Sequence, residues 1–198
     1  MKKIVLMMLL SMLTVTMGFA QESAFTEAVS RYKSAKTASA TAVMVKHNKA
    51  MTKNKSYDGA LYMKDPNKVA ITANNGKEQL VMGNTFTMVM GGHKHVASAK
   101  TASQFAAFKA VLLSVLSGGK TNISNIQGVK VTQQSGNVVV TMIPAQAKRL
   151  MFTSFVLEIN KRTGALETLK LNSSRGYTQY NFSNFRFGAS VNDKVFNP

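Results

Sequence analysis

Residues 59–71 read GALYMKDPNKVAI and contain two short apolar runs on either side of a polar break. Successive side chains of an extended chain point to opposite faces, so that Leu61 and Met63 fall on one face, and Ala60, Tyr62 and Lys64 fall on the other. Pro66 interrupts this pattern, because proline cannot donate a hydrogen bond to a neighbouring strand, and the alternation resumes after it. The stretch therefore predicts two strands joined by a Pro-Asn turn.

The same alternation extends over most of the chain and predicts further strands, separated by turn-like segments rich in Gly and Asn. The predicted strands are 38–48, 57–64, 68–74, 78–83, 85–91, 94–98, 127–133, 137–143, 152–160, 165–173 and 177–187. No internal repeat or linker divides them, and a short amphipathic helix is expected at 23–34. The pattern predicts one meandering antiparallel sheet of roughly ten strands.

One helical segment, TASQFAAFKAVLLSVLSGGK at 101–120, interrupts the strands. Thr101 and Gln104 have the spacing of a capping box, and the pair of glycines that starts at Gly118 is a typical helix stop. Between them runs one apolar stripe made of Phe105, Phe108, Leu112, Val115 and Leu116. Such a helix packs on one face of the sheet, either as a permanent part of the core or as a movable lid over a cavity. Periodicity alone does not separate these two interpretations.

The first twenty residues have the three parts of a secretory signal peptide. Lys2 and Lys3 form a basic region, residues 4–17 are apolar, and small residues precede Gln21. We expect cleavage near Ala20/Gln21, a domain spanning 21–198 and a periplasmic location, whereas a retained N-terminal anchor is the alternative. Because the chain has no cysteine, we expect neither disulfides nor a lipid anchor attached through a thiol.

The charge balance is strongly basic, with 25 Lys and Arg against 8 Asp and Glu, for a net charge of +17. Such a surface favours anionic partners. Export argues against nucleic acid, so we expect contacts with an anionic membrane surface or an acidic protein.

No group of residues predicts catalysis, a metal site or a cofactor. His93 and His95 share one side of a strand but have no neighbouring carboxylate or cysteine to complete a metal site. The chain has no G-x-S-x-G motif, and its SGGK sequence follows a helix, unlike a phosphate-binding loop. We therefore expect a binding protein and not an enzyme.

Two further features allow two interpretations each. The first predicted hairpin carries four lysines, Lys46, Lys49, Lys53 and Lys55. They form either a solvated tip or a docking patch for anionic lipid. Methionines gather on the strands, with Met82, Met88 and Met90 close together in sequence. Methionine adapts its shape, which suits either a surface for variable apolar ligands or ordinary filling of a core.

Several segments resemble, in the same order, those of the periplasmic outer-membrane lipoprotein carrier family, LolA. GALYMKDPNKVAI is similar to the family pattern G-x-L-aromatic-x-K-x-P-N, and EQLVMGNTFTMVMGG to its strand–turn–strand. The central helix, VKVTQQSGNVVVTMIP, FVLEINKRTGALETLKL and the closing YNFSNFRFGASVNDKVFNP follow. The resemblance covers nearly the whole chain after the leader.

This resemblance implies a mainly β fold with an α lid, in which one open antiparallel sheet of about eleven strands curves into a half-barrel covered by helices. It also implies a monomeric carrier that binds the acyl chains of lipoproteins. Such a carrier receives them from an inner-membrane ABC-type release complex and delivers them to an outer-membrane acceptor, LolB. That acceptor carries an N-terminal cysteine, which this chain lacks. The alternative is a module of the same fold that binds another lipid or a protein.

We expect the cavity of such a carrier to be lined by alternate residues of the strands, together with the apolar stripe of the central helix as its lid. The expected cavity residues are Leu61, Met63, Val69, Ile71, Phe86, Met88, Met90, Phe155 and Leu157. One departure from the family is Asp65, which stands where the family has an arginine that holds the lid shut. The lid of this chain is therefore expected to be held differently or more weakly.

Overall fold

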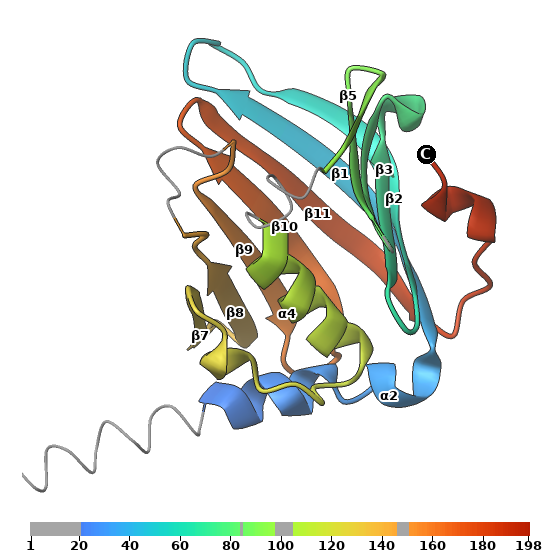
Figure 1. Cartoon of the computed structure of the whole chain (residues 1–198), viewed down its shortest axis with the longest axis vertical. Coiled ribbons are helices and arrows are strands. Elements are labelled where there is room, and N and C mark those ends of the chain that lie inside the picture. Colours follow the sequence, from blue (N-terminus) through green and yellow to red (C-terminus); the bar gives the residue numbers. More distant parts are fainter. Residues whose placement is uncertain (1–20, 84, 98–104, 146–150) are drawn as a thin grey trace, which may run out of the picture.

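The computed structural model describes residues 21–83, 85–97, 105–145 and 151–198. Its main element is one antiparallel sheet of eleven strands that curves around a concave face (Figure 1). The strands are β1 (Thr37–Asn48), β2 (Lys55–Lys64), β3 (Lys68–Ala73), β4 (Glu78–Met82), β5 (Phe86–Met90), β6 (His93–Val96), β7 (Val129–Gln134), β8 (Asn137–Met142), β9 (Ser154–Asn160), β10 (Leu166–Ser173) and β11 (Gly176–Phe187). The predicted open antiparallel sheet is confirmed, and each segment predicted as a strand overlaps one of these.

The strand order is β6-β5-β4-β3-β2-β1-β11-β10-β9-β8-β7. It consists of two meanders, β1–β6 and β7–β11, that join where β1 pairs with β11 along nearly the full length of both strands. The two edge strands, β6 and β7, do not pair with each other in the described part of the chain, so the sheet stays open. The chain must cross from one edge to the other between them, and this crossing carries the central helix over the concave face (Figure 1).

The central helix is α4 (Ala106–Leu116), and its predicted end is confirmed, because Gly118 and Gly119 follow it with positive φ. The predicted capping residues Thr101 and Gln104 lie outside the described residues. At the N-terminal side, residues 21–29 are helical and α2 (Tyr32–Ala35) follows. Short 3-10 turns occupy Asn74–Gly76, Ile123–Asn125 and Asp193–Phe196. None of the helices in the described part of the chain is long and apolar enough to cross a membrane.

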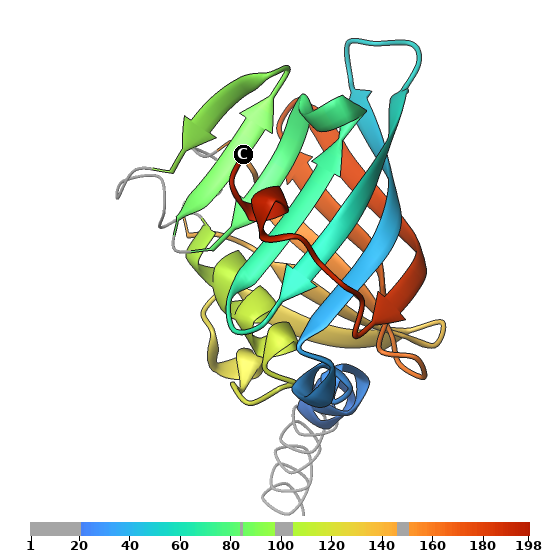
Figure 2. The same ribbon diagram turned by 90° about the vertical axis from the view of Figure 1, so that its right-hand side faces the viewer.

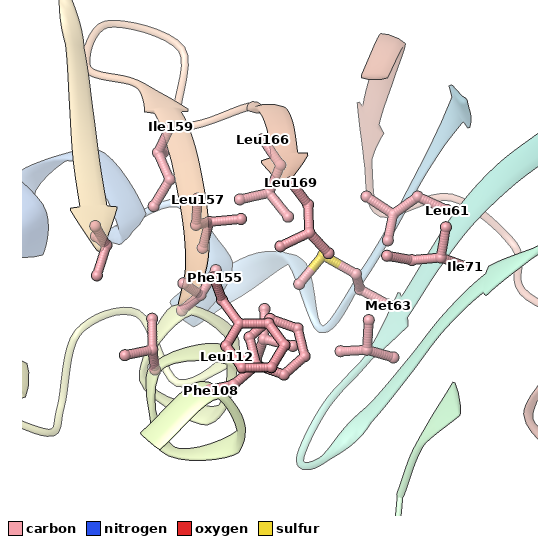
Figure 3. Packing of buried hydrophobic residues seen from close by; sticks show 14 of the residues in the cluster. Leu61, Met63, Ile71, Phe108, Leu112, Phe155, Leu157, Ile159, Leu166 and Leu169 are labelled. Carbon is pink, nitrogen blue, oxygen red and sulfur yellow. The ribbon is translucent and has the colours of Figure 1, made fainter. Parts of the chain in front are cut away.

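The core lies between the concave face and α4, because alternate residues of each strand point toward the helix. In β9, the inward residues Phe155, Leu157 and Ile159 are all fully buried. Figure 3 shows them facing Phe108 and Leu112 of α4 within one apolar cluster. Burial of this continuous apolar surface is the main force that holds the half-barrel together.

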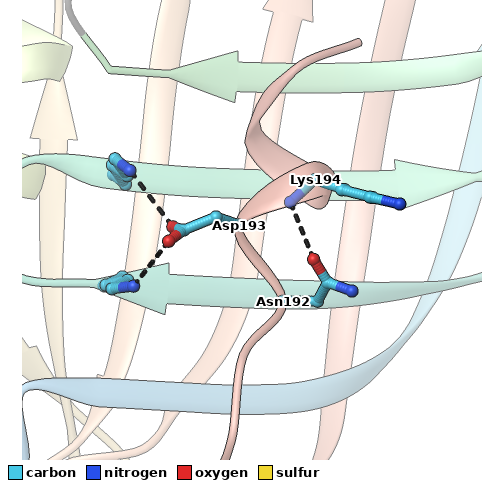
Figure 4. A network of polar contacts seen from close by, with 5 residues as sticks. Asn192, Asp193 and Lys194 are labelled. Carbon is cyan, nitrogen blue, oxygen red and sulfur yellow. Dashed lines mark hydrogen bonds and ion pairs between the residues drawn. The ribbon is translucent and has the colours of Figure 1, made fainter.

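The C-terminal segment crosses the opposite, outer face of the sheet (Figure 2). Phe196 packs there against Ala70 and Val81 in a small second cluster. The Asp193 carboxylate accepts hydrogen bonds from Lys64 Nζ at 2.9 Å and Lys68 Nζ at 3.1 Å (Figure 4). These two hydrogen bonds lower the pKa of Asp193 below its ordinary value. The segment is thereby attached to β2 and β3.

Candidate functional site

Helix α4 lies directly on the concave face, in contact through aromatic rings. The ring of Phe108 stacks on Phe155 with centroids 4.7 Å apart, and its edge approaches Phe86 at 6.3 Å. Phe105 stacks on Phe86 at 4.0 Å. Such aromatic pairs stabilise a fold by more than the burial of their apolar surface alone. In this structure, α4 therefore covers and fills the lower part of the concave face (Figure 3).

The C-terminal end of α4 meets the N-terminal helical segment, where Gly119 lies against Thr26 and Val29. Phe25 and Val29 of the N-terminal helical segment are fully buried in the same cluster as α4. The Glu22 carboxylate accepts hydrogen bonds from the backbone N–H groups of Ile123 and Ser124, both at 3.1 Å, just after the loop that follows α4. These contacts tie the end of α4 and the turn that follows it to the N-terminal segment, and one face of the helix is buried in the core in this structure.

The structure brings the predicted cavity residues and the predicted lid residues together in one cluster. Leu61, Met63, Val69, Ile71, Phe86, Phe155 and Leu157 are buried in it, together with Phe105, Phe108, Leu112, Val115 and Leu116. Met88 is partly buried and packs against the cluster, whereas Met90 is half-buried and is not part of it. Contact of these residues with a ligand stays a prediction.

Beyond the end of this cluster, toward the β1–β2 and β10–β11 hairpins, the concave face is hollow. A cavity of about 470 Å³ lies next to a second of about 370 Å³. We call the two together the mouth cavity, because both are lined by Lys46, Glu78, Phe152, Leu171, Ser173, Arg175 and Thr178. Since Phe152 and Leu171 are also members of the core cluster, the mouth cavity continues directly into the apolar interior.

The mouth cavity contains a partly buried ion pair. Lys46 Nζ lies 2.7 Å from Glu78 Oε1, and that oxygen also accepts a hydrogen bond from the Gly91 backbone N–H at 3.2 Å. Burial, with a smaller contribution from the negative charge of Glu78, raises the pKa of the nearby Tyr180 well above its ordinary value.

This ion pair corrects one interpretation of the first hairpin. Lys49, Lys53 and Lys55 are exposed as a solvated tip requires, but Lys46 is half-buried and faces the concave side. The alternation of β1 could have revealed this, because Lys46 has the same parity as the buried Met44. The same pattern could have placed Glu78 and Tyr180 on the inward face, because each is separated by two positions from an apolar residue of its own strand.

The methionines divide between the two interpretations of their role. Met44, Met63, Met82 and Met142 have no exposed surface and fill the core. Met88, Met90 and Met151 line the mouth cavity, and exposed Met51 lines its second part. Only this second group is placed to adapt to a ligand without unpacking the core.

Two other predicted features have no role in the concave face. His93 and His95 are exposed on the edge strand β6, and no cluster of three or more potential metal ligands occurs among the described residues. Asp65 is exposed in the β2–β3 turn, where its backbone N–H donates to the Lys36 carbonyl at 2.7 Å.

A sequence model of the family described as "Outer membrane lipoprotein carrier protein LolA" matches residues 33–198. No curated protein matches the chain significantly. Among solved structures, the chain is similar to a putative outer membrane lipoprotein-sorting protein domain from Vibrio parahaemolyticus, with 13% identity and a TM-score of 0.46 over 91% of this chain and 97% of that one. A LolA superfamily protein from Nitrosomonas europaea has 8% identity and a TM-score of 0.39 over 89% and 96% of the two chains.

A third similar structure is the lipoprotein LppX from Mycobacterium tuberculosis, with 12% identity and a TM-score of 0.37 over 87% of this chain and 97% of that one. These likenesses are distant, whereas the family match covers most of the sequence and agrees with the open eleven-stranded sheet and its covering helix. The chain therefore belongs to the LolA family of outer membrane lipoprotein carrier proteins.

Proposed function

We propose that this protein binds the acyl chains of lipoproteins on the concave face of its sheet and carries them from the inner to the outer membrane. The observation that carries the proposal is the continuity between the mouth cavity and the apolar core through Phe152 and Leu171. An acyl chain that enters at the hairpins meets hydrocarbon side chains as far as α4. Membership of the lipoprotein carrier family supports the same ligand.

The physical task of such a carrier is to replace the burial that a membrane provides. Moving an acyl chain into water costs about 0.8 kcal/mol per methylene, so a long chain costs on the order of 10 kcal/mol. The concave face can provide this burial without any chemistry when α4 moves aside and the ligand takes its place. We therefore propose α4 as the movable element and no catalytic role for any residue.

The proposed route needs an exported protein. The leader at residues 1–20 would direct the chain to the periplasm, where an inner-membrane ABC-type release complex would supply the lipoprotein and a LolB-like acceptor would receive it. The excess of basic residues would favour brief contact with anionic membrane surfaces on the way. A binding module for another lipid remains the second candidate, because the polar lining of the mouth cavity favours a ligand with a charged head.

A titration with a triacylated lipopeptide tests the acyl-chain proposal. We expect residues 21–198 to bind the lipopeptide saturably, with displacement of a neutral fluorescent probe such as N-phenyl-1-naphthylamine. The same peptide without acyl chains should not displace the probe, since the proposed site recognises hydrocarbon. Equal displacement by both peptides, or displacement by phospholipid alone, would contradict the proposal and favour the second candidate.

A further inference from the structure

The charges that line the mouth cavity are unbalanced. Lys46, Lys55 and Arg175 contribute three positive charges, and Glu78 is the one carboxylate among the described lining residues. Among these four side chains the excess is two positive charges. A concave surface with apolar walls concentrates such a potential, because the low-dielectric walls reduce screening by water.

Glu78 neutralises only part of the site, because its single negative charge is paired with Lys46. Its side chain is 10% exposed and is held by Lys46 and by the Gly91 N–H. Arg175 takes no part in any of the ion pairs found between described residues. It is exposed in the β10–β11 turn, and its backbone carbonyl accepts a hydrogen bond from the Lys49 N–H at 2.9 Å, which fixes the turn. The Arg175 guanidinium is therefore available at the rim of the cavity.

The floor of the same cavity is apolar. Met88, Phe152 and Leu171 line it, and Phe152 and Leu171 are 7% and 2% exposed, respectively. Ser173 and Thr178, which carry hydroxyl groups, also line the cavity. The 470 Å³ volume of the larger part is within the range of roughly 300–1,000 Å³ that is usual for small-molecule sites. The lining of the mouth cavity therefore combines apolar side chains, hydroxyl groups and positive charges.

We propose that the mouth cavity binds the anionic head of an amphiphile, a carboxylate or a phosphate, at Arg175 and Lys46 while its acyl chain lies on Met88, Phe152 and Leu171. The planar guanidinium of Arg175 can donate two parallel hydrogen bonds to either anion. Lys46 lies on β1, the strand that pairs with β11, and its ammonium group, held by Glu78, can donate a further hydrogen bond to the anion. This inference rests on the proposed binding of acyl chains to the concave face, and an anionic head places its ligand with the second candidate, a lipid other than a lipoprotein.

The experiment compares amphiphiles of one chain length that differ only in the head. Palmitate, palmitoyl lysophosphatidic acid, monopalmitoylglycerol and hexadecyltrimethylammonium are each used, below their micellar concentrations, to displace N-phenyl-1-naphthylamine from residues 21–198. We expect the two anions to bind about tenfold more tightly than the neutral glyceride, which corresponds to about 1.4 kcal/mol. The difference between palmitate and the phosphate shows which anion the site prefers.

Arg175→Gln tests the assignment, with Arg162→Gln as its matched control. Both arginines are exposed in turns, but Arg162 lies in the β9–β10 turn and does not line the mouth cavity. We expect Arg175→Gln to remove most of the tenfold preference without a change in Tm, and Arg162→Gln to keep it. An unchanged preference in Arg175→Gln would overturn the assignment.

The remaining outcomes separate the inference from the function on which it rests. Equal affinity for anionic and neutral amphiphiles overturns the head-group inference and leaves acyl-chain binding intact. Preferential binding of the ammonium amphiphile overturns it in favour of recognition by Glu78. If no amphiphile displaces the probe, both the inference and the proposed function are wrong.

Discussion

A Phe108→Glu variant is expected to lose about 3–5 kcal/mol of unfolding free energy, with a Tm lower by roughly 10 °C or more. Phe108 is 1% exposed and stacked on Phe155, and it lies in a cluster of apolar side chains. The substitution would thus bury an uncompensated charge and remove an aromatic pair at the same time. Thermal unfolding followed by circular dichroism measures the effect.

The matched control is Ala106→Glu, because Ala106 is exposed in the first turn of the same helix. A carboxylate near the N-terminus of a helix is tolerated or slightly stabilising, so the Tm of this variant should stay near that of the unchanged protein. A Phe108→Glu variant with an unchanged Tm but weakened acyl binding would show that the sheet is stable without α4. That result would contradict the buried role of the helix described here.

Cross-linking α4 to the sheet is expected to abolish binding of the triacylated lipopeptide. The chain has no cysteine of its own, so Phe86→Cys/Phe105→Cys introduces a single thiol pair where two rings now stack at 4.0 Å. A short bridging reagent such as dibromobimane would join them and keep α4 against the concave face. Since the ligand must displace α4 to reach the apolar surface beneath it, we expect affinity to fall by more than tenfold after bridging.

Two controls isolate the effect of the bridge. The double-cysteine protein without reagent reports the effect of the substitutions alone. Thr41→Cys/Ser183→Cys, bridged in the same way, joins strands that are already paired, at a site where the two hydroxyl oxygens lie 2.8 Å apart. Its affinity should not change on bridging. If the Phe86/Phe105 bridge leaves affinity unchanged as well, ligand entry does not require movement of α4.

The sheet was predictable from the sequence because its signal is local. Alternation over 152–160 placed Phe155 and Leu157 on one face, and both are buried in the core of the structure. The same is true of the opening hairpin, where Leu61 and Met63 are buried and Tyr62 packs on the outer face. The geometry of a strand points successive side chains to opposite faces, so an apolar residue recurs at every second position wherever one face is buried.

The site was less predictable because its geometry depends on contacts between distant parts of the chain. Alternation indicates that Lys46 faces inward, but not that Glu78 lies opposite it. Arg175 lies in a turn, where no period assigns a direction. The C-terminal attachment is similar, since Asp193 meets Lys64 across 129 residues of sequence. Whether α4 is lid or core also depends on its partners, which a helical period does not reveal.

Native mass spectrometry of the protein isolated from the cells that produce it tests the proposed function most directly. Under gentle ionisation, we expect a fraction of the molecules to carry one additional mass that dissociates as an acylated lipoprotein or its lipid-bearing N-terminal peptide. Isolation of a Phe86/Phe105-bridged protein should remove this species. An empty protein, or one that carries phospholipid without any lipoprotein, would contradict the carrier role.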